Sequence, residues 1–111
     1  MFTITDVNGT LVIELLIKSL DARTNKDFRW EIEKKLESQR QVVFDLTSLT
    51  FIDSSGLGTL LSCLRQVTAS GGDLKLCALT PQVRAVFQLV RMHRLFDIYN
   101  TRDEAVQAFH A

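Results

Sequence analysis

The sequence has little proline, no net charge and no long apolar run. Proline occurs once in 111 residues and 46% of the residues are apolar, a composition that argues against a disordered chain. Lysine and arginine together number 13, and so do aspartate and glutamate. This balance argues against a basic groove for nucleic acid, because phosphate contacts require clustered cations. The apolar runs are about half as long as a bilayer-spanning helix, so we expect no membrane segment.

Cysteine and histidine are also scarce. Cys63 lies in a helical pattern of leucines and Cys77 in an apolar alternation, so we expect two small buried side chains rather than a disulfide. There is no C-x-x-C pair, and neither His93 nor His110 has a cysteine or carboxylate at metal-ligand spacing. The N-terminus MFTITDVNG shows no secretory signal. We therefore expect a soluble cytoplasmic protein without a metal or cofactor.

The apolar pattern alternates between the period of a strand and the period of a helix. Asn8-Gly9 is typical of a hairpin turn, and Gly71-Gly72 of a helix end. In chain order we predict strands 2–7 and 10–17, a helix over 24–38, a strand over 42–46, a helix from the FIDSSG segment to Gly71, a strand over 73–79, a helix from Pro81, a strand over 96–99 and a helix over 103–109. This order predicts one α/β domain over residues 1–111. Its single sheet is mixed but mostly parallel, with an N-terminal antiparallel hairpin and about four α-helices.

The predicted helices each have an apolar stripe that should face the core. Phe28, Ile32 and Leu36 form the first stripe, and Trp30 lies opposite, either over a neighbouring loop or on a contact surface. The second helix has its stripe at Leu57, Leu60, Leu61, Leu64 and Thr68. Its other face holds Thr59, Ser62, Cys63 and Gln66, and we interpret it as a solvated face or as a flat surface that a partner approaches closely. On the third helix, Leu89 and Met92 either extend that surface or are covered by Leu95 and Phe96.

The segment FIDSSGLG, residues 51–58, places an acid, two serines and two glycines where a helix begins. Sites in open α/β sheets lie at the carboxyl ends of strands, and Leu20-Asp21 follows another such end. One interpretation is a helix cap, since Asp, Ser and Gly are favoured at helix starts. One cap accounts for one of Asp53, Ser54 or Ser55, and does not account for all three.

A catalytic serine, a nucleotide-binding loop and a phosphorylation switch are the alternatives to a cap. A catalytic serine needs a base, and the segment is neither G-x-S-x-G nor placed in an order that provides a histidine. Gly56-Leu57-Gly58 is a lone G-x-G without a following Lys-Ser/Thr, a weak signal for a nucleotide. A phosphorylation switch fits better, because a helix N-terminus suits a phosphate. Ser54 or Ser55 would be the acceptor, and Asp53 would orient the kinase's Mg²⁺ or hold the serine hydroxyl.

Over almost its whole length the sequence resembles the STAS domains of bacterial anti-sigma factor antagonists. The resemblance is carried by Leu20-Asp21, by VVFDLTSLTFIDSSGLGTLL, by GGDLKL and by PQVRAVFQLVRMHRLFDIY. Its strongest part is DSSGLG, residues 53–58, which matches the family's phosphorylation motif. The resemblance implies the STAS fold and a protein without catalysis of its own.

In that family the unphosphorylated antagonist binds an anti-sigma factor and frees the sigma factor or controls another output. The anti-sigma factor is often a serine kinase that phosphorylates the antagonist, and a PP2C-type phosphatase restores it. The resemblance places the phosphoserine at Ser54 and motif acids at Asp53 and Asp21. Lys18 stands where the family usually has glycine, which predicts a differently shaped loop before Asp21. With the small-residue face included, the predicted motif and partner-binding residues are Asp21, Asp53, Ser55, Gly56, Leu57, Gly58, Thr59 and Ser62.

Two other functions remain compatible with the resemblance. One is a STAS accessory subunit of a lipid-transport complex, which would hold an ATPase and need no serine available to a kinase. The other is a sensor of a small ligand, for which the sequence shows no dedicated polar pocket.

Overall fold

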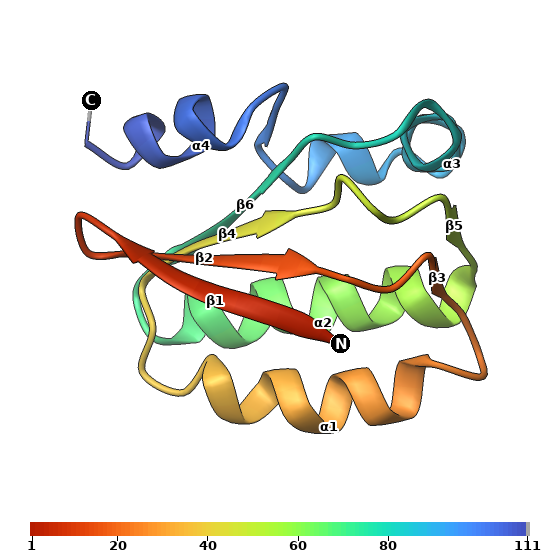
Figure 1. The fold of residues 1–111 in the computed structure, drawn as a ribbon, viewed down its shortest axis with the longest axis horizontal. Helices are drawn as coiled ribbons and strands as arrows, with labels where there is room; N and C mark the ends of the chain where they lie inside the picture. Colours follow the sequence, from red (N-terminus) through yellow and green to blue (C-terminus); the bar gives the residue numbers. More distant parts are fainter. Residues whose placement is uncertain (111) are drawn as a thin grey trace.

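The computed structural model describes residues 1–110, which form a mixed sheet with helices on both faces (Figure 1). Five strands lie in the order β1-β2-β4-β6-β7. The hairpin β1–β2 is antiparallel, and the pairs β2–β4, β4–β6 and β6–β7 are parallel. The bounds of these strands are Phe2–Val7 (β1), Thr10–Leu15 (β2), Gln41–Asp45 (β4), Asp73–Cys77 (β6) and Ile98–Tyr99 (β7). The helices are Asn25–Lys35 (α1), Ser54–Ala69 (α2), Pro81–Leu89 (α3) and Arg102–Ala108 (α4).

This arrangement confirms the predicted α/β class with its antiparallel hairpin and its four α-helices, and it adds three short elements. The strands β3 (Ser19–Leu20) and β5 (Phe51–Ile52) pair in parallel as a separate two-stranded sheet, so the prediction of a single sheet was wrong. A 3₁₀ helix, η1 (Met92–Arg94), follows α3. Strands of two residues are too short to show a period in the sequence. The predicted strand 10–17 ends at Leu15, where the chain turns towards β3.

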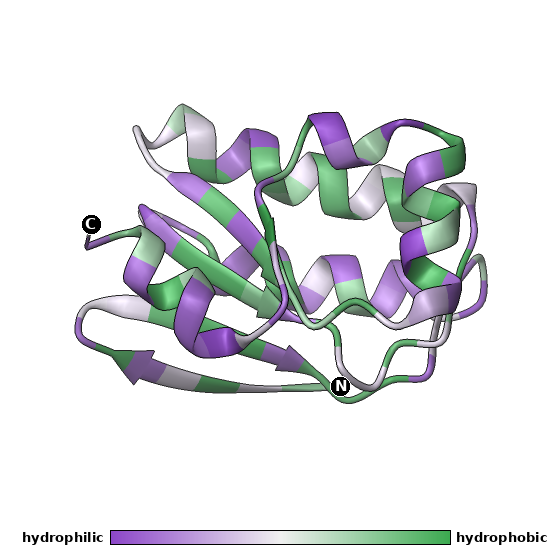
Figure 2. Ribbon diagram, turned by 90° about the horizontal axis from the view of Figure 1, so that it is seen from above, coloured by the Kyte–Doolittle hydropathy of each residue, from purple (hydrophilic) through white to green (hydrophobic). Residues whose placement is uncertain are grey.

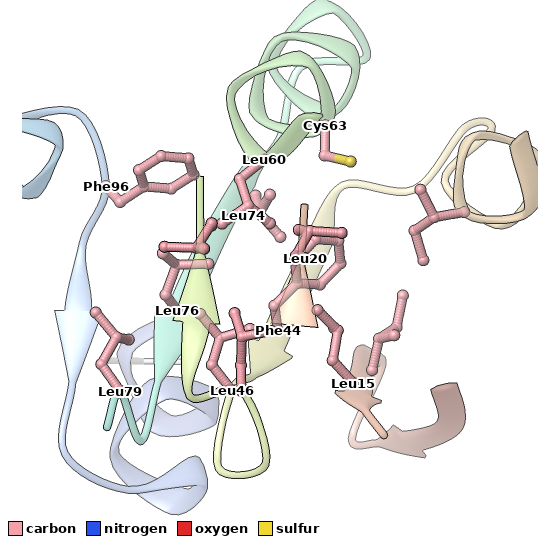
Figure 3. Packing of buried hydrophobic residues seen from close by; sticks show 14 of the residues in the cluster. Leu15, Leu20, Phe44, Leu46, Leu60, Cys63, Leu74, Leu76, Leu79 and Phe96 are labelled. Carbon is pink, nitrogen blue, oxygen red and sulfur yellow. The ribbon is translucent and has the colours of Figure 1, made fainter. Parts of the chain in front are cut away.

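The sheet buries alternating side chains on its two faces, as the pleat of a strand requires. Phe44 and Leu76 belong to the larger cluster, which lies between the sheet and the helices α1, α2 and α3 (Figure 3). Val43 and Cys77 belong to a smaller cluster under α4. In Figure 2 the strands and the helices both carry apolar and polar segments. Both faces of the central strands are therefore covered, as is usual for parallel pairs.

Both cysteines are buried, as predicted. Cys63 on α2 and Cys77 on β6 are free thiols with no exposed surface. Burial in apolar surroundings raises the pKa of each thiol to about 12. Both side chains are therefore neutral packing groups at physiological pH.

Helix α2 has a wider buried arc than its leucine stripe indicated. Its buried residues are Gly56, Thr59, Leu60, Cys63 and Val67, whereas Leu57, Leu61 and Leu64 are half-buried at the margin of the core and Thr68 is exposed. The prediction that Thr59 and Cys63 lie on an open face was wrong. Helix α1 packs across them, so α2 contacts both the sheet and a second helix, and small side chains allow the two helices to approach closely.

The stripe predicted for α1 is confirmed, since Phe28, Ile32 and Leu36 are fully buried. Trp30 is 65% exposed, and the Nζ atom of Lys34 lies 3.3 Å from its ring centroid. No loop of residues 1–110 covers this ring, so the first alternative is wrong and the contact surface stays a prediction. None of the helices in residues 1–110 combines the length and apolar character needed to cross a bilayer.

A partly buried ion cluster attaches the start of α4 to the sheet. The Arg102 guanidinium donates to Asp45 Oδ2 at 2.8 and 3.1 Å and to Glu14 Oε1 at 2.8 Å. Burial acts to raise the pKa of Asp45, but hydrogen bonds from Thr47 and the Arg102 guanidinium outweigh it and hold this pKa below its ordinary value. A carboxyl with a depressed pKa in the folded state stabilises the fold above its unfolded pKa, and this contribution is lost as the pH falls.

We expect Arg102→Gln to lower the free energy of unfolding at neutral pH by roughly 1–2 kcal/mol, because Asp45 loses its charged partner and the site is partly open to solvent. The pKa of Asp45 should rise, so the midpoint of acid unfolding should move to higher pH. Urea melts between neutral and acid pH would measure both changes. Arg65, which is exposed and makes no ion pair within residues 1–110, provides the control Arg65→Gln. Equal acid midpoints for Arg102→Gln and wild type would contradict this account.

Candidate functional site

Two chain segments that are distant in sequence meet at one corner of the fold, at the carboxyl ends of β3 and β5 (Figure 1). Leu20 pairs with Ile52, and the Asp53 N–H donates to Leu20 O at 3.3 Å. Asp21 and Asp53 therefore follow two adjacent strands. The structure thus brings together the two acids that the sequence analysis assigned to one surface.

Asp53 is the N-cap of α2, and its carboxylate also reaches the neighbouring loop. Its Oδ1 accepts a hydrogen bond from Gly56 N at 3.0 Å, which caps the helix. Its Oδ2 accepts one from Ala22 N at 3.1 Å, across a separation of 31 residues. A single carboxylate thus connects α2 to the loop between β3 and α1. The cap interpretation is correct for this residue, and the second bond could not have been read from the sequence.

Asp21 shapes the loop on the other side of that connection. Its Oδ1 accepts hydrogen bonds from the backbone N–H groups of Arg23 at 2.9 Å and Thr24 at 3.2 Å. These bonds, that of Arg23 first, lower the pKa of Asp21, while burial acts against them. Thr24, which the sequence analysis did not select, donates from its hydroxyl to Ser19 O at 2.8 Å and accepts from Asp21 N at 3.0 Å. Asp21 is thus an ionised loop anchor.

The Lys18 side chain is exposed and takes no part in these hydrogen bonds. Its carbonyl oxygen accepts from Thr50 N at 2.8 Å and from Phe51 N at 3.1 Å. The position that usually holds a glycine in the resembling family therefore acts through its backbone, by fixing the entry into β5.

Ser54 is the first residue of α2 and is exposed, whereas Ser55 is half-buried. Within residues 1–110 neither hydroxyl makes a hydrogen bond, and the backbone N–H groups of the two serines have no acceptor. The first turn of α2 contains no acidic residue. This helix N-terminus therefore presents a free hydroxyl, two free N–H groups and the positive end of the helix dipole to solvent.

The two glycines of the motif have different structural roles. A Cβ on Gly56 would lie 2.3 Å from Leu20 O and 2.8 Å from Ile52 Cγ1, so only glycine fits where α2 crosses β3. A Cβ on Gly58 would have nothing within 4 Å. Gly58 is exposed, Leu57 is half-buried and Phe51 is 52% exposed, so the residues on either side of Ser54 give this surface a partly apolar character.

Thr59 and Ser62 do not belong to this corner. Thr59 has no exposed surface, and its hydroxyl hydrogen-bonds Asn25 Oδ1 on α1. Ser62 accepts a hydrogen bond from Arg29 of α1 at 3.2 Å. Both residues connect two helices, so the expectation that Thr59 contacts a partner is wrong. The sequence-predicted residues that do meet at the corner are Asp21, Asp53, Ser54, Ser55, Gly56, Leu57 and Gly58.

Known proteins resemble this chain both in sequence and in fold. The model of the STAS domain matches residues 2–105. A Bordetella bronchiseptica protein that bears the name "Putative anti-sigma factor antagonist BtrV" is 35% identical over 100 residues, which is 86% of each chain. The solved structure of the anti-sigma factor antagonist SpoIIAA in its unphosphorylated form has a TM-score of 0.79 at 27% identity and covers 99% of this chain and 96% of that one. SpoIIAA of Bacillus in the phosphorylated form has a TM-score of 0.70 at 26% identity, covering 98% and 99%.

Alanine substitutions at Gly56 and Gly58 test how closely α2 packs against β3. We expect Gly56→Ala to destabilise the fold by roughly 1–3 kcal/mol, because the new methyl group overlaps a backbone oxygen that cannot move alone. Gly58→Ala should be neutral or stabilising by up to about 1 kcal/mol, because alanine favours an exposed helix. Thermal melts of the two variants would measure both effects. Similar melting temperatures would mean that α2 and β3 are less tightly packed than described.

Asp53→Asn should retain the fold but lower the free energy of unfolding by about 0.5–2 kcal/mol. The amide has one acceptor oxygen, so it can serve Gly56 N or Ala22 N but not both. Urea unfolding gives the energy, and hydrogen exchange at Ala22 identifies the lost bond. Exchange at Ala22 as slow as in wild type would show that the carboxylate does not hold this loop.

Proposed function

The chain belongs to the STAS domain family, and on that basis we propose that it is an anti-sigma factor antagonist controlled by reversible phosphorylation of Ser54. The observation that carries the proposal is the exposed hydroxyl of Ser54 at the open N-terminus of α2. Both the 35% identity to the Bordetella protein and the likeness to SpoIIAA, a protein solved in unphosphorylated and phosphorylated forms, support it.

The chemical step takes place in the active site of the partner, an anti-sigma factor with serine kinase activity. The Ser54 oxygen attacks the γ-phosphorus of Mg-bound ATP, the bond to the β,γ-bridging oxygen breaks, and the hydroxyl proton is lost as ADP leaves. The serine brings an exposed hydroxyl that no internal hydrogen bond restrains. A PP2C-type phosphatase removes the phosphoryl group by hydrolysis, which releases inorganic phosphate and returns the hydroxyl to Ser54.

Asp53 acts in this scheme as a positioning residue. Both of its carboxylate oxygens already accept backbone N–H groups, from Gly56 and Ala22. They therefore fix the start of α2 and the adjacent loop as one surface rather than hold the serine hydroxyl. A kinase that binds this corner meets Ser54 in a defined place relative to Asp21.

The phosphate then acts on the interface and leaves the fold intact. A phosphoserine carries about −1.5 to −2 charges at neutral pH, and a helix N-terminus stabilises such a charge by roughly 0.3–2 kcal/mol. The surrounding surface of Phe51, Leu57 and Gly58 suits a close contact from which water is largely removed. An uncompensated charge buried there would weaken binding by several kcal/mol, and each 1.4 kcal/mol is about tenfold in affinity. The antagonist is thus released from the anti-sigma factor when Ser54 is phosphorylated.

We expect the cognate kinase to transfer one phosphate from Mg-ATP to Ser54. Ser54→Ala should accept none, whereas the matched control Ser55→Ala should retain the acceptor. Asp53→Asn should be labelled more slowly, because its loop is less firmly held. Intact-mass analysis of the protein from cells, before and after phosphatase treatment, would measure the modification. Equal labelling of Ser54→Ala and wild type would exclude Ser54, and absence of any phosphate would favour the transport-complex subunit.

The same variants test the switch. Ser54→Asp should melt like wild type and bind the anti-sigma factor much more weakly, and Ser54→Ala should bind regardless of ATP. Calorimetry of the three proteins gives the affinities, and thermal melts give the stabilities. Equal affinities would rule out the switch, and a much lower melting temperature of Ser54→Asp would place the effect in the fold instead of the interface.

A further inference from the structure

A second surface, formed by the end of α3 and by η1, exposes apolar side chains on a well-packed support. Leu89 is 84% exposed, Leu95 54% and Val90 49%, all within seven residues of the chain. We name this surface, with Arg91 and Arg94, the α3–η1 face. The expectation that Leu95 covers Leu89 was wrong, because both side chains point to solvent.

Buried side chains and backbone hydrogen bonds fix the backbone of the α3–η1 face. Met92 is 8% exposed, and the rings of Phe87 and Phe96 pack with centroids 6.1 Å apart. Backbone hydrogen bonds close each turn, from Val90 N to Val86 O at 3.1 Å and from Leu95 N to Met92 O at 3.0 Å. The backbone that carries the exposed side chains therefore needs little further ordering when a partner binds, which favours affinity.

Arg91 occupies a backbone position that normally suits glycine. It ends α3 with φ 61° and ψ 24°, in the left-handed region. Glycine would adopt this conformation without strain and is the usual residue at such helix ends. Here an arginine adopts this strained backbone conformation, and its long cationic side chain lies beside the exposed leucines.

The charge of the segment is of one sign. Residues 81–96 contain three arginines and one histidine but no aspartate or glutamate, although the whole chain is neutral. Within residues 1–110 no carboxylate forms an ion pair with Arg84, Arg91 or Arg94. The next acid, Asp97, is paired with Lys75 at 3.0 Å. These cations are therefore available to an external partner of opposite charge.

The composition favours a protein as the occupant. All three cations are arginine, which binds carboxylates in a fixed two-bond geometry and is enriched at protein interfaces, whereas lysine is depleted there. Apolar side chains between the arginines suit a partner segment that alternates carboxylates with apolar residues. Nucleic acid would contact phosphates along an extended basic groove, without apolar side chains at its centre.

The position of the face relative to Ser54 is compatible with one partner contacting both. Helix α3 packs against β5, the strand that directly precedes Asp53 and Ser54. The molecule measures 32 × 26 × 22 Å, and a standard interface buries about 800 Å² on each partner, a patch roughly 28 Å across. A partner centred on the Ser54 corner can therefore extend onto α3.

We propose that the α3–η1 face docks an acidic, partly apolar segment of the same kinase that phosphorylates Ser54, and thereby determines which kinase is recognised. This proposal rests on the proposed function. Docking away from the reacting hydroxyl contributes to binding and not to the chemical step. It should therefore affect the KM and the affinity, with little effect on kcat.

The test uses the purified kinase that labels Ser54. Calorimetry gives the Kd of the kinase for each variant, and the steady-state kinetics of labelling give KM and kcat. We expect Arg91→Glu/Arg94→Glu and Leu89→Ser each to raise the Kd and KM by roughly tenfold, with kcat unchanged. Lys35→Glu/Arg65→Glu makes the same change of charge at exposed cations towards the other ends of α1 and α2, and Leu16→Ser removes an exposed leucine elsewhere. Both controls should bind like wild type.

Two further measurements show whether the variants act on binding rather than on folding, and whether the arginine charges contribute to binding. Arg91→Gly suits the left-handed backbone, so it should raise the melting temperature while it weakens binding. Binding of the wild-type chain should also weaken with salt more steeply than binding of Arg91→Glu/Arg94→Glu.

Normal kinase affinity and KM in the face variants, together with labelling of wild type, would overturn the docking assignment and leave the proposed function intact. The same variants also distinguish other occupants of the face. If they bind the kinase normally but lose binding to phosphatidylglycerol vesicles, the docking assignment is overturned and the face belongs to a membrane contact. If they bind the kinase normally but lose self-association, it is likewise overturned and the face contacts a second copy of the chain. A wild-type chain that no kinase binds or labels would overturn both the proposed function and the docking assignment.

Discussion

The Asp53 carboxylate is the interaction on which the functional corner depends. One oxygen caps α2 through Gly56 N, and the other holds the β3–α1 loop through Ala22 N. Without the first bond the start of α2 would lack its side-chain cap, and without the second the loop that carries Asp21 would no longer be joined to that helix. The location of Ser54, the proposed phosphate acceptor, follows from this one group. An acid next to an acceptor serine therefore has a structural role that comes before any role in recognition.

The close approach of α2 to β3 imposes the second constraint at the same corner. Gly56 leaves no room for a side chain against Leu20 O, whereas Gly58 is unrestricted. Thr59 and Cys63 continue the close packing against the core and α1. One side of α2 is thus committed to the interior, and the exposed residues Ser54 and Gly58 remain for contact with a partner. A rigid support under an exposed serine allows a change of charge to alter binding without altering the fold.

The arginines outside this corner differ in whether a carboxylate of the same chain pairs with them. On the far face of the sheet, Arg102 connects α4 to Asp45 and Glu14 through a partly buried ion cluster. On α3 and η1, by contrast, Arg91 and Arg94 have no carboxylate partner within residues 1–110. Arginines of the same chain therefore serve two purposes. Paired with buried carboxylates they hold an element in place, and unpaired beside exposed leucines they provide a surface for an acidic partner.

The local features of this protein could be read from its sequence, because turns, caps and apolar periods depend on residues close together in the chain. Asn8-Gly9 indicated the hairpin, and both residues have positive φ. Pro81 indicated the start of α3, and the stripe of Phe28, Ile32 and Leu36 indicated the buried side of α1. The acid, serines and glycines of DSSGLG likewise indicated where α2 begins.

The contacts between segments about 30 residues apart could be seen only in the folded chain, because no local period encodes them. The pairing of β3 with β5 and the bond from Asp53 to Ala22 belong to this class. The packing of α1 on Thr59 belongs to it as well. Thr59 was predicted to lie on the surface of α2 but is buried, because a helix that contacts both a sheet and another helix buries more than its leucine stripe. The sequence alone thus determined which residues carry the motif, and the packing of α1, α2 and β3 decided which of them a partner can reach.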